Sequence, residues 1–132
     1  MSNEIITQEF LYGICKEKGF LAKSLYVVTT WPVDSLAPVM ENIEEHLTYQ
    51  VALEKRGILF AAGPTFSRDG THWEGEGMVV IRADSLAEAH ETAEQDPMHK
   101  SGAREFDIHP WLLNEGSVTL KVNYSDGNIE VL

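Results

Sequence analysis

The longest periodic stretch of the chain runs from Asp34 to Gly57. Apolar side chains recur in it every three or four residues, which is the pattern of an amphipathic helix. The repeated positions are Leu36, Val39, Met40, Ile43, Leu47 and Val51, and Glu54 continues the series. Asp34 or Ser35 can cap the start, and Pro38 then falls in the first turn, where a missing N–H costs little. Gly57 favours an end there, so the sequence predicts one long helix.

Shorter patterns predict the remaining elements. A short helix is expected at 4–18, capped by Asn3, and the second main helix at 85–94, where Ser85 and Glu88 have the spacing of a capping box. Runs of β-branched and aromatic residues or strict alternation predict strands at 20–31, 58–66, 77–83, 103–111 and 117–124. The second and third strands are expected to pair as a hairpin across the loop at 67–75.

The order strand, helix, strand, strand, helix, strand is that of a ferredoxin-like α+β fold with an antiparallel sheet. Two helices cover only one face of a four-stranded sheet, but the first and third strands are apolar on both faces. An exposed apolar face of that size is rare on a monomer, which favours a homodimer. The C-terminal strand could cross to the second copy. We expect an N-terminal arm at 1–19, the main domain at 20–115 and a dimer-associated extension at 116–132.

Composition and charge narrow the partners. The chain has 132 residues, the length of one domain, and a formal net charge of −11, which argues against nucleic acid and against anionic membranes. Cys15 is the single cysteine, which excludes an internal disulfide and fits a cytoplasmic protein. The N-terminal residues lack the pattern of a signal peptide, and no apolar run approaches membrane-spanning length.

His46 is the first candidate for chemistry. It lies on the margin of the apolar stripe of the long helix, where an imidazole can reach a pocket and still pack its edge. The alternative is a boundary histidine that has no catalytic task.

Four ordered motifs resemble the YCII-related (YciI-like) family over about residues 24–111. They are Glu45 to Tyr49, Gly57 with Ala62-Gly63-Pro64, Gly77 with Val79 and Val80, and Asp96-Pro97 with Gly102 and Ile108 to Trp111. The resemblance implies a dimeric α+β barrel with a pocket between sheet and helices, in which His46 and Asp96 match the family's His–Asp pair. The N-terminal helix and the strand after Gly116 belong to a longer version.

The resemblance also implies a substrate class. The family is similar in fold to muconolactone isomerases, and a dehydrochlorinase of chloroaromatic breakdown belongs to it, which points to small cyclic or aromatic compounds. A carboxylate that holds one ring nitrogen leaves the other free to move a proton. Elimination, isomerisation and hydrolysis remain open, as does a non-catalytic dimeric binding module. Asp96 could instead act purely as an N-cap that accepts the N–H of Met98 or His99.

Weaker candidates for substrate binding surround this pair. They are Tyr49, Gly63, Pro64, His72, Trp73, His99 and Trp111. His72 and Trp73 could form a lid, face solvent or meet a second copy, and Trp111 could line either the pocket or the interface. Packing is the alternative for Tyr49, and a surface position is the alternative for His99. The sequence has no zinc, calcium or phosphate-loop motif, so we expect no metal and no cofactor.

Overall fold

The computed structural model describes residues 4–132, so the expected cap Asn3 lies outside the described part of the chain. Residue contacts divide the chain into two compact units. One unit is Ser24–Leu112, and the other combines the residues up to Lys23 with Leu113–Leu132. Each unit is described by itself.

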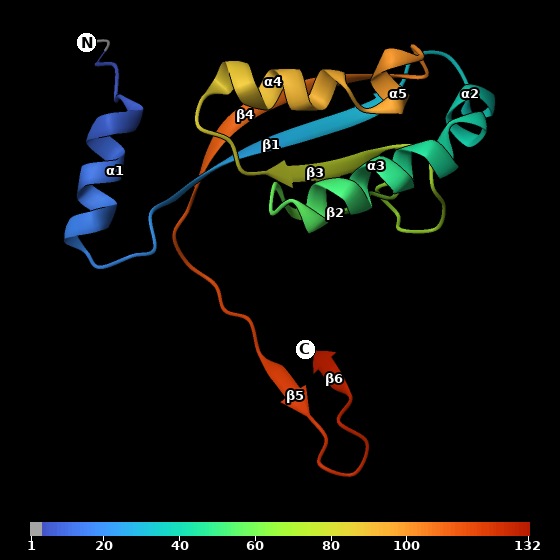
Figure 1. Cartoon of the computed structure of the whole chain (residues 1–132). Coiled ribbons are helices and arrows are strands. Elements are labelled where there is room, and N and C mark those ends of the chain that lie inside the picture. The colour runs from blue at the N-terminus through green and yellow to red at the C-terminus, as the bar shows by residue number, and fades with distance from the viewer. Residues whose placement is uncertain (1–3) are drawn as a thin grey trace. The chain divides into compact units, whose positions relative to one another are not determined.

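A four-stranded sheet forms the centre of the Ser24–Leu112 unit (Figure 1). Its strands are β1 (Lys23–Pro32), β2 (Leu59–Pro64), β3 (Gly77–Ile81) and β4 (Arg104–Leu113). Their order is β2-β3-β1-β4, and β3 pairs antiparallel with both of its neighbours. This topology confirms the predicted ferredoxin-like α+β fold and the expected pairing of the second and third strands.

The stretch predicted as one long helix contains two helices, α2 (Leu36–Glu41) and α3 (Ile43–Lys55). The prediction of a continuous helix is therefore wrong at Asn42, whose backbone has φ −105° and ψ 3°. The Asn42 side-chain amide donates to the carbonyl oxygen of Pro38 at 2.8 Å. Short amide side chains compete with helical hydrogen bonds in this way, which accounts for the break. It places His46 in the first turns of α3.

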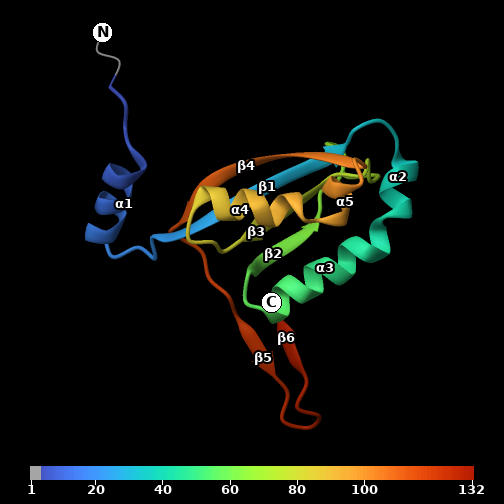
Figure 2. The same ribbon diagram turned by 45° about the horizontal axis from the view of Figure 1, so that its top comes forward.

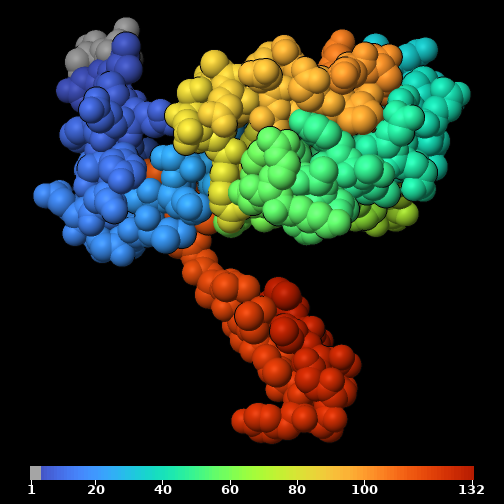
Figure 3. All heavy atoms as spheres, viewed as in Figure 1, coloured from blue at the N-terminus to red at the C-terminus, as the bar shows by residue number. Residues whose placement is uncertain are grey.

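Two further helices follow β3, namely α4 (Leu86–Glu94) and the short α5 (Pro97–Lys100). The Ser85 cap is present, because its hydroxyl accepts the Glu88 N–H at 3.1 Å. The Glu88 carboxylate accepts the N–H of the preceding residue, Asp84, at 3.2 Å, in place of the Ser85 N–H of a full capping box. Helices α3, α4 and α5 lie on the same face of the sheet (Figures 1 and 2). In the space-filling view the green atoms of α3 adjoin the yellow and orange atoms of α4 and α5 (Figure 3).

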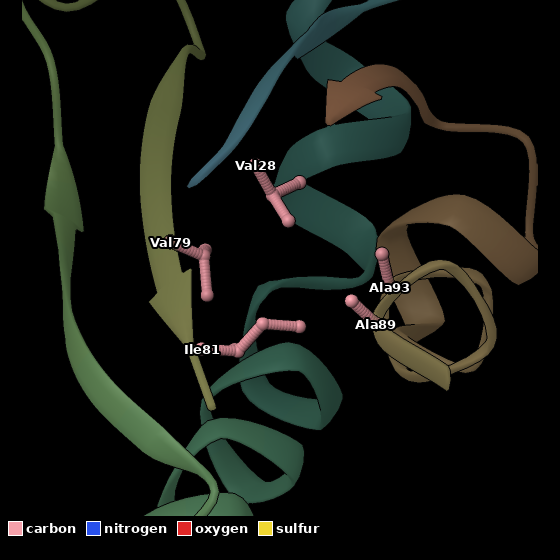
Figure 4. Packing of buried hydrophobic residues seen from close by; sticks show 5 residues of the cluster. All are labelled: Val28, Val79, Ile81, Ala89 and Ala93. Carbon is pink, nitrogen blue, oxygen red and sulfur yellow. The ribbon is translucent and has the colours of Figure 1, made fainter. Parts of the chain in front are cut away.

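The buried core lies between this helical layer and the sheet. Val28, Val79 and Ile81 point from the strands toward Ala89 and Ala93 of α4 (Figure 4). The small alanine side chains let the helix approach the strands closely, so that the valine and isoleucine side chains fill the space between them.

The opposite face of the sheet is partly apolar and exposed. The β1–β3 register pairs Thr29 with Met78 and Val27 with Val80, and cross-strand partners point to the same face of a sheet. Met78 is exposed, as is Trp31, which follows Thr29 by two residues on the same side of β1. This face carries no helix within the Ser24–Leu112 unit (Figures 1 and 2).

The second unit contains α1 (Gln8–Glu17) and a hairpin of β5 (Leu120–Val122) and β6 (Ile129–Val131). Helix α1 begins later than predicted, because Thr7 caps it by accepting the Phe10 N–H at 3.1 Å. The predicted strand at 117–124 is shorter, and the tail beyond it forms β6. In residues 4–132 no helix is both long and apolar enough to span a bilayer.

Replacing Gly75 with alanine is expected to destabilise the protein strongly. Gly75 has φ +86°, and an added Cβ would lie 2.6 Å from Pro32 Cγ and 2.7 Å from Leu36 Cδ2. The left-handed backbone alone costs about 1–2 kcal/mol, and the overlap adds about 1–3 kcal/mol. Urea unfolding should therefore show a loss of about 2–5 kcal/mol for Gly75→Ala.

Gly70→Ala in the same loop is the matched control. Gly70 has φ +76°, but an added Cβ would meet nothing within 4 Å. It should lose only the backbone part, about 1–2 kcal/mol. Equal losses at the two positions would show that Gly75 is not wedged against Pro32 and Leu36.

Candidate active site

His46 of α3 and Asp96 at the start of α5 are 50 positions apart in sequence, and their side chains are in contact. His46 Nδ1 lies 2.9 Å from both carboxylate oxygens of Asp96. The His46 side chain is 12% exposed and that of Asp96 only 6%. The fold thus brings the two residues within hydrogen-bonding distance, although their roles in catalysis remain predictions.

Asp96 has further partners that fix its orientation. Its Oδ1 accepts the Met98 N–H at 2.9 Å, so Asp96 caps α5 and binds His46 at the same time. Its Oδ2 accepts a hydrogen bond from Gln50 Nε2 at 3.2 Å. The carboxylate dictates the orientation of this amide, which leaves Gln50 Oε1 buried and without a partner among the described residues.

The pKa of Asp96 lies below its usual value. Burial alone would raise this pKa, but the hydrogen bond and charge of His46, the Met98 N–H and the charge of His99 together outweigh burial. Asp96 is therefore ionised at neutral pH and only accepts hydrogen bonds. It follows that His46 Nδ1 carries a proton, and that Nε2 is the nitrogen left free to take up or release one.

His46 opens into a cavity of about 540 Å³ between α3 and the sheet. This volume lies in the range of small-molecule sites, roughly 300–1,000 Å³. Most of the surface is apolar, and the lining residues are Thr30, Ile43, His46, Leu47, Gln50, Val51, Glu54, Leu59, Ala62, Gly63, Pro64, Phe66, Trp73, Gly77, Met78, Val79 and Arg104. The arrangement places one proton-transferring group on the wall of a chamber that suits a small apolar compound.

Three of the other predicted binding residues line this cavity, namely Gly63, Pro64 and Trp73. The structure does not bring the remaining four to it. Tyr49 packs on α4 and donates its hydroxyl proton to Thr92 O at 2.7 Å. His72 lies in the exposed loop beside Glu74, and Trp111 is exposed on β4.

His99 is half-buried, which argues against a surface position, the alternative given for it above. Its Nδ1–H donates to Ala93 O at 2.6 Å, and its Nε2 lies 2.8 Å from the Thr30 hydroxyl oxygen. Its ring centroid lies 4.4 Å from that of Phe106. Burial lowers the pKa of His99 despite opposing contributions from Ala93 O and Asp96, which favours a neutral ring. The single Thr30 hydroxyl proton lies within reach of both His99 Nε2, at 2.8 Å, and Glu105 O, at 3.0 Å.

Sequence reasoning missed four polar residues of the cavity: Thr30, Gln50, Glu54 and Arg104. Gln50 follows His46 by one helical turn, so helix geometry alone places the two side chains on one face. Arg104, Phe106 and Ile108 are two residues apart along β4 and therefore point to the same face of the sheet. Phe106 and Ile108 pack on the core under the helices, so Arg104 places a basic side chain on the helix-covered face. That charge on an otherwise apolar face was the available signal.

The described residues show no group of three or more His, Cys, Asp or Glu side chains placed to hold a metal ion.

The fold and the site define a class: a small ferredoxin-like domain with a buried His–Asp pair that opens into an apolar cavity. The YCII-related domain model matches residues 24–112, and the chain therefore belongs to this family. The family match bears out the resemblance that the sequence motifs indicated.

One solved structure supports the same fold. It is the 5-chloro-2-hydroxyhydroquinone dehydrochlorinase from Burkholderia phenoliruptrix AC1100, in complex with 2,5-dihydroxybenzoquinone. It is similar with a TM-score of 0.54 and 24% sequence identity, over 66% of this chain and 92% of the other. At this identity the similarity shows the fold. The comparison with curated protein sequences found no significant match.

The free energy of unfolding should fall as the pH drops below about 6.5, the ordinary pKa of histidine. Burial lowers the pKa of His99 in the folded state, so the unfolded chain binds the proton first and acid favours unfolding. This loss continues until the pH passes the lowered pKa of the folded state. Urea unfolding between about pH 7 and 5 should show a shallower slope for His99→Gln than for the wild type.

The matched control is His90→Gln, because the side chain of His90 is 48% exposed on α4. This variant should keep the wild-type slope. A slope that persists unchanged in His99→Gln would contradict the burial argument.

Proposed function

We propose that the protein is a small enzyme in which His46 moves a proton on a small cyclic or aromatic compound. The observation that carries this proposal is the contact of His46 Nδ1 with both oxygens of the buried Asp96 carboxylate, at 2.9 Å, on the wall of the apolar cavity. Asp96 holds the imidazole in one tautomer and one orientation. The Nε2 lone pair then acts as a general base, and the resulting imidazolium lies against the carboxylate.

Three reactions are compatible with one proton-transferring group: elimination, isomerisation and hydrolysis. The structural neighbour is a dehydrochlorinase, which favours elimination for this chain. In such a step His46 Nε2 takes a proton from the substrate, the electrons of the broken bond form a double bond, and the leaving group departs with its electron pair. These proton and electron-pair movements require no second proton-transferring group in the cavity.

Turnover should depend on both members of the pair. Halogenated phenols, hydroxyquinones and lactones form the first panel of compounds to assay. His46→Ala removes the base and should lower kcat by about 10²–10⁴-fold. Asp96→Asn removes the charge that orients and stabilises the imidazolium, so it should also lower kcat while the chain still folds.

His90→Ala is the control, because it removes a histidine from α4 that does not line the cavity. It should keep wild-type kcat, and thermal unfolding should show whether each variant is folded. Undiminished turnover in folded His46→Ala would reject the assigned roles. Compounds that stabilise the protein but are never converted would indicate a non-catalytic binding module instead.

We also propose that the chain forms a homodimer. The β5–β6 register pairs Leu120 with Val131 and Val122 with Ile129, which gathers four apolar side chains on one face of the hairpin. These side chains are 57% to 70% exposed. An isolated two-stranded hairpin is marginal in water, and an apolar face needs a cover. A second copy of the chain can cover both this face and the exposed apolar side of the sheet.

Sedimentation should therefore show a dimer for the wild type at micromolar concentrations. Replacing Leu120 and Val122 with glutamate places charges on the apolar face and should shift the protein toward monomer. Lys121→Glu is the matched control, because it changes the net charge by the same two units but lies on the opposite face of the hairpin. A monomeric wild type, or a double variant that remains fully dimeric, would contradict this assembly.

A further inference from the structure

Arg104 is a buried cation on the wall of the cavity that His46 shares. The residue is 5% exposed, begins β4 and lines the same chamber as His46. Burying a guanidinium without an opposite charge is costly. Yet the ion pairs found among residues 4–132 all join a histidine to a carboxylate, and none includes Arg104. The charge therefore lies in an apolar wall without a counter-ion from the described chain.

The surrounding backbone holds the guanidinium in place. Its Nε–H donates to Gly75 O at 2.9 Å. Gly75 packs closely against Pro32 and Leu36, since a Cβ added to it would overlap both side chains. The Arg104 Cζ atom also lies 5.9 Å from the centroid of the Trp73 ring. One of the five N–H donors is thus used, and the group is oriented without being neutralised.

The remaining donors belong to the two Nη atoms of a residue that lines the cavity. The hydrogen bonds within residues 4–132 give neither Nη atom a partner, and neither atom is among the fully buried atoms without partners. Arg104 Nη1 lies 3.9 Å from the Cβ position of Gly77, which also lines the cavity. A side chain at Gly77 would cover this end of the guanidinium, so the glycine keeps it accessible.

Asp96 does not supply the missing partner. Its two oxygens already accept from His46, Met98 and Gln50. Burial lowers the pKa of Arg104 and the charge of Asp96 opposes this shift, but a guanidinium stays protonated at physiological pH. The positive charge of Arg104 therefore has no ion-pair partner among the described residues and is available to an anion from outside the chain.

We propose that Arg104 is an anion-binding residue and that the ligand of this cavity is a small, mostly apolar compound with an anionic oxygen. The oxygen belongs to a carboxylate or to an ionised phenol or enol, which share the chemistry that a guanidinium recognises. The apolar walls receive the rest of the molecule. This inference deepens the proposed function, since Arg104 would hold one end of the substrate while His46 moves a proton at another.

Binding of matched anionic and neutral probes tests the proposal without any turnover assay. Benzoate is paired with benzamide, and para-nitrophenolate with para-nitroanisole, and their affinities are measured by calorimetry on the intact chain. The anion of at least one pair should bind the wild type about 10- to 100-fold more tightly than its neutral partner, the effect of one charged hydrogen bond. The pair with the larger ratio distinguishes a carboxylate from a phenolate ligand.

Variants assign the preference to Arg104. Arg104→Met should bind anion and neutral partner alike, while Arg104→Lys should keep part of the preference, because it retains the charge without the fork. Arg68→Met, at an exposed loop position with the same change in net charge, should keep the wild-type ratio. If Arg104→Met does not fold, the reduced ratio in Arg104→Lys carries the test.

Three results would overturn the proposal: equal affinities within both probe pairs in the wild type, an undiminished ratio in folded Arg104→Met, or an undiminished ratio in Arg104→Lys where Arg104→Met does not fold. His46→Ala should keep the anion preference, because it removes the base and leaves the guanidinium. Failure of the proposed enzymatic function would appear as absent turnover, or as turnover unaffected by His46→Ala, with these affinity ratios intact. The two failures are thus distinguishable.

Discussion

The site depends on one buried carboxylate. Asp96 begins α5 by accepting the Met98 N–H and reaches across to α3 through His46 and Gln50. Burying a charge is costly unless hydrogen bonds compensate it, so this carboxylate depends on its donors being in place. The same oxygens that stabilise the short helix also fix the tautomer of the imidazole. Stability and chemistry therefore rest on the same few bonds, and the helix start and the proposed base cannot be separated by mutation without disturbing both.

The cavity exists because side chains are missing or small where α3 and the sheet face one another. Ala62, Gly63 and Gly77 line it from β2 and β3, whereas Val28 and Ile81 fill the neighbouring space under α4, and Val79 belongs to both the core and the cavity wall. The sheet thus has a packed half and a hollow half under one helical layer. Because the packed half is rigid, the hollow half can stay open without collapse, and it presents polar groups on walls that are otherwise apolar.

Local patterns predicted most of the elements and their order, although not the division into α2 and α3 or the strand β6. Each of these patterns depends on residues that are close in sequence, so the folded chain retains it. Examples are the cap at Ser85, the Asp-Pro start of α5 and the alternation along β4. The break at Asn42 was missed, because apolar periodicity continues through it and only the competing amide reveals it. Arg104 was missed for another reason: its meaning depends on Gly75 and Trp73, which approach it only in the folded chain. Family motifs located His46 and Asp96, but no pattern in the sequence predicts which side chains of the helices and the sheet face one another across the cavity.

The charges of the site also indicate how an acidic protein could bind the anionic ligand that we propose. The chain carries a formal net charge of −11, which opposes any anion at long range. Around the cavity the local balance is different, since Asp96 behind the wall is already matched by donors and Arg104 is not, while Glu54, the carboxylate among the lining residues, is exposed to solvent. Screening by salt weakens the long-range repulsion far more than a buried contact. In the proposed reaction, proton transfer to His46 would create a cation beside Asp96, while the anionic oxygen of the proposed ligand would lie in the cavity that Arg104 lines. The imidazolium and the anionic oxygen of this proposal would thus each lie near an opposite charge that the fold has already placed.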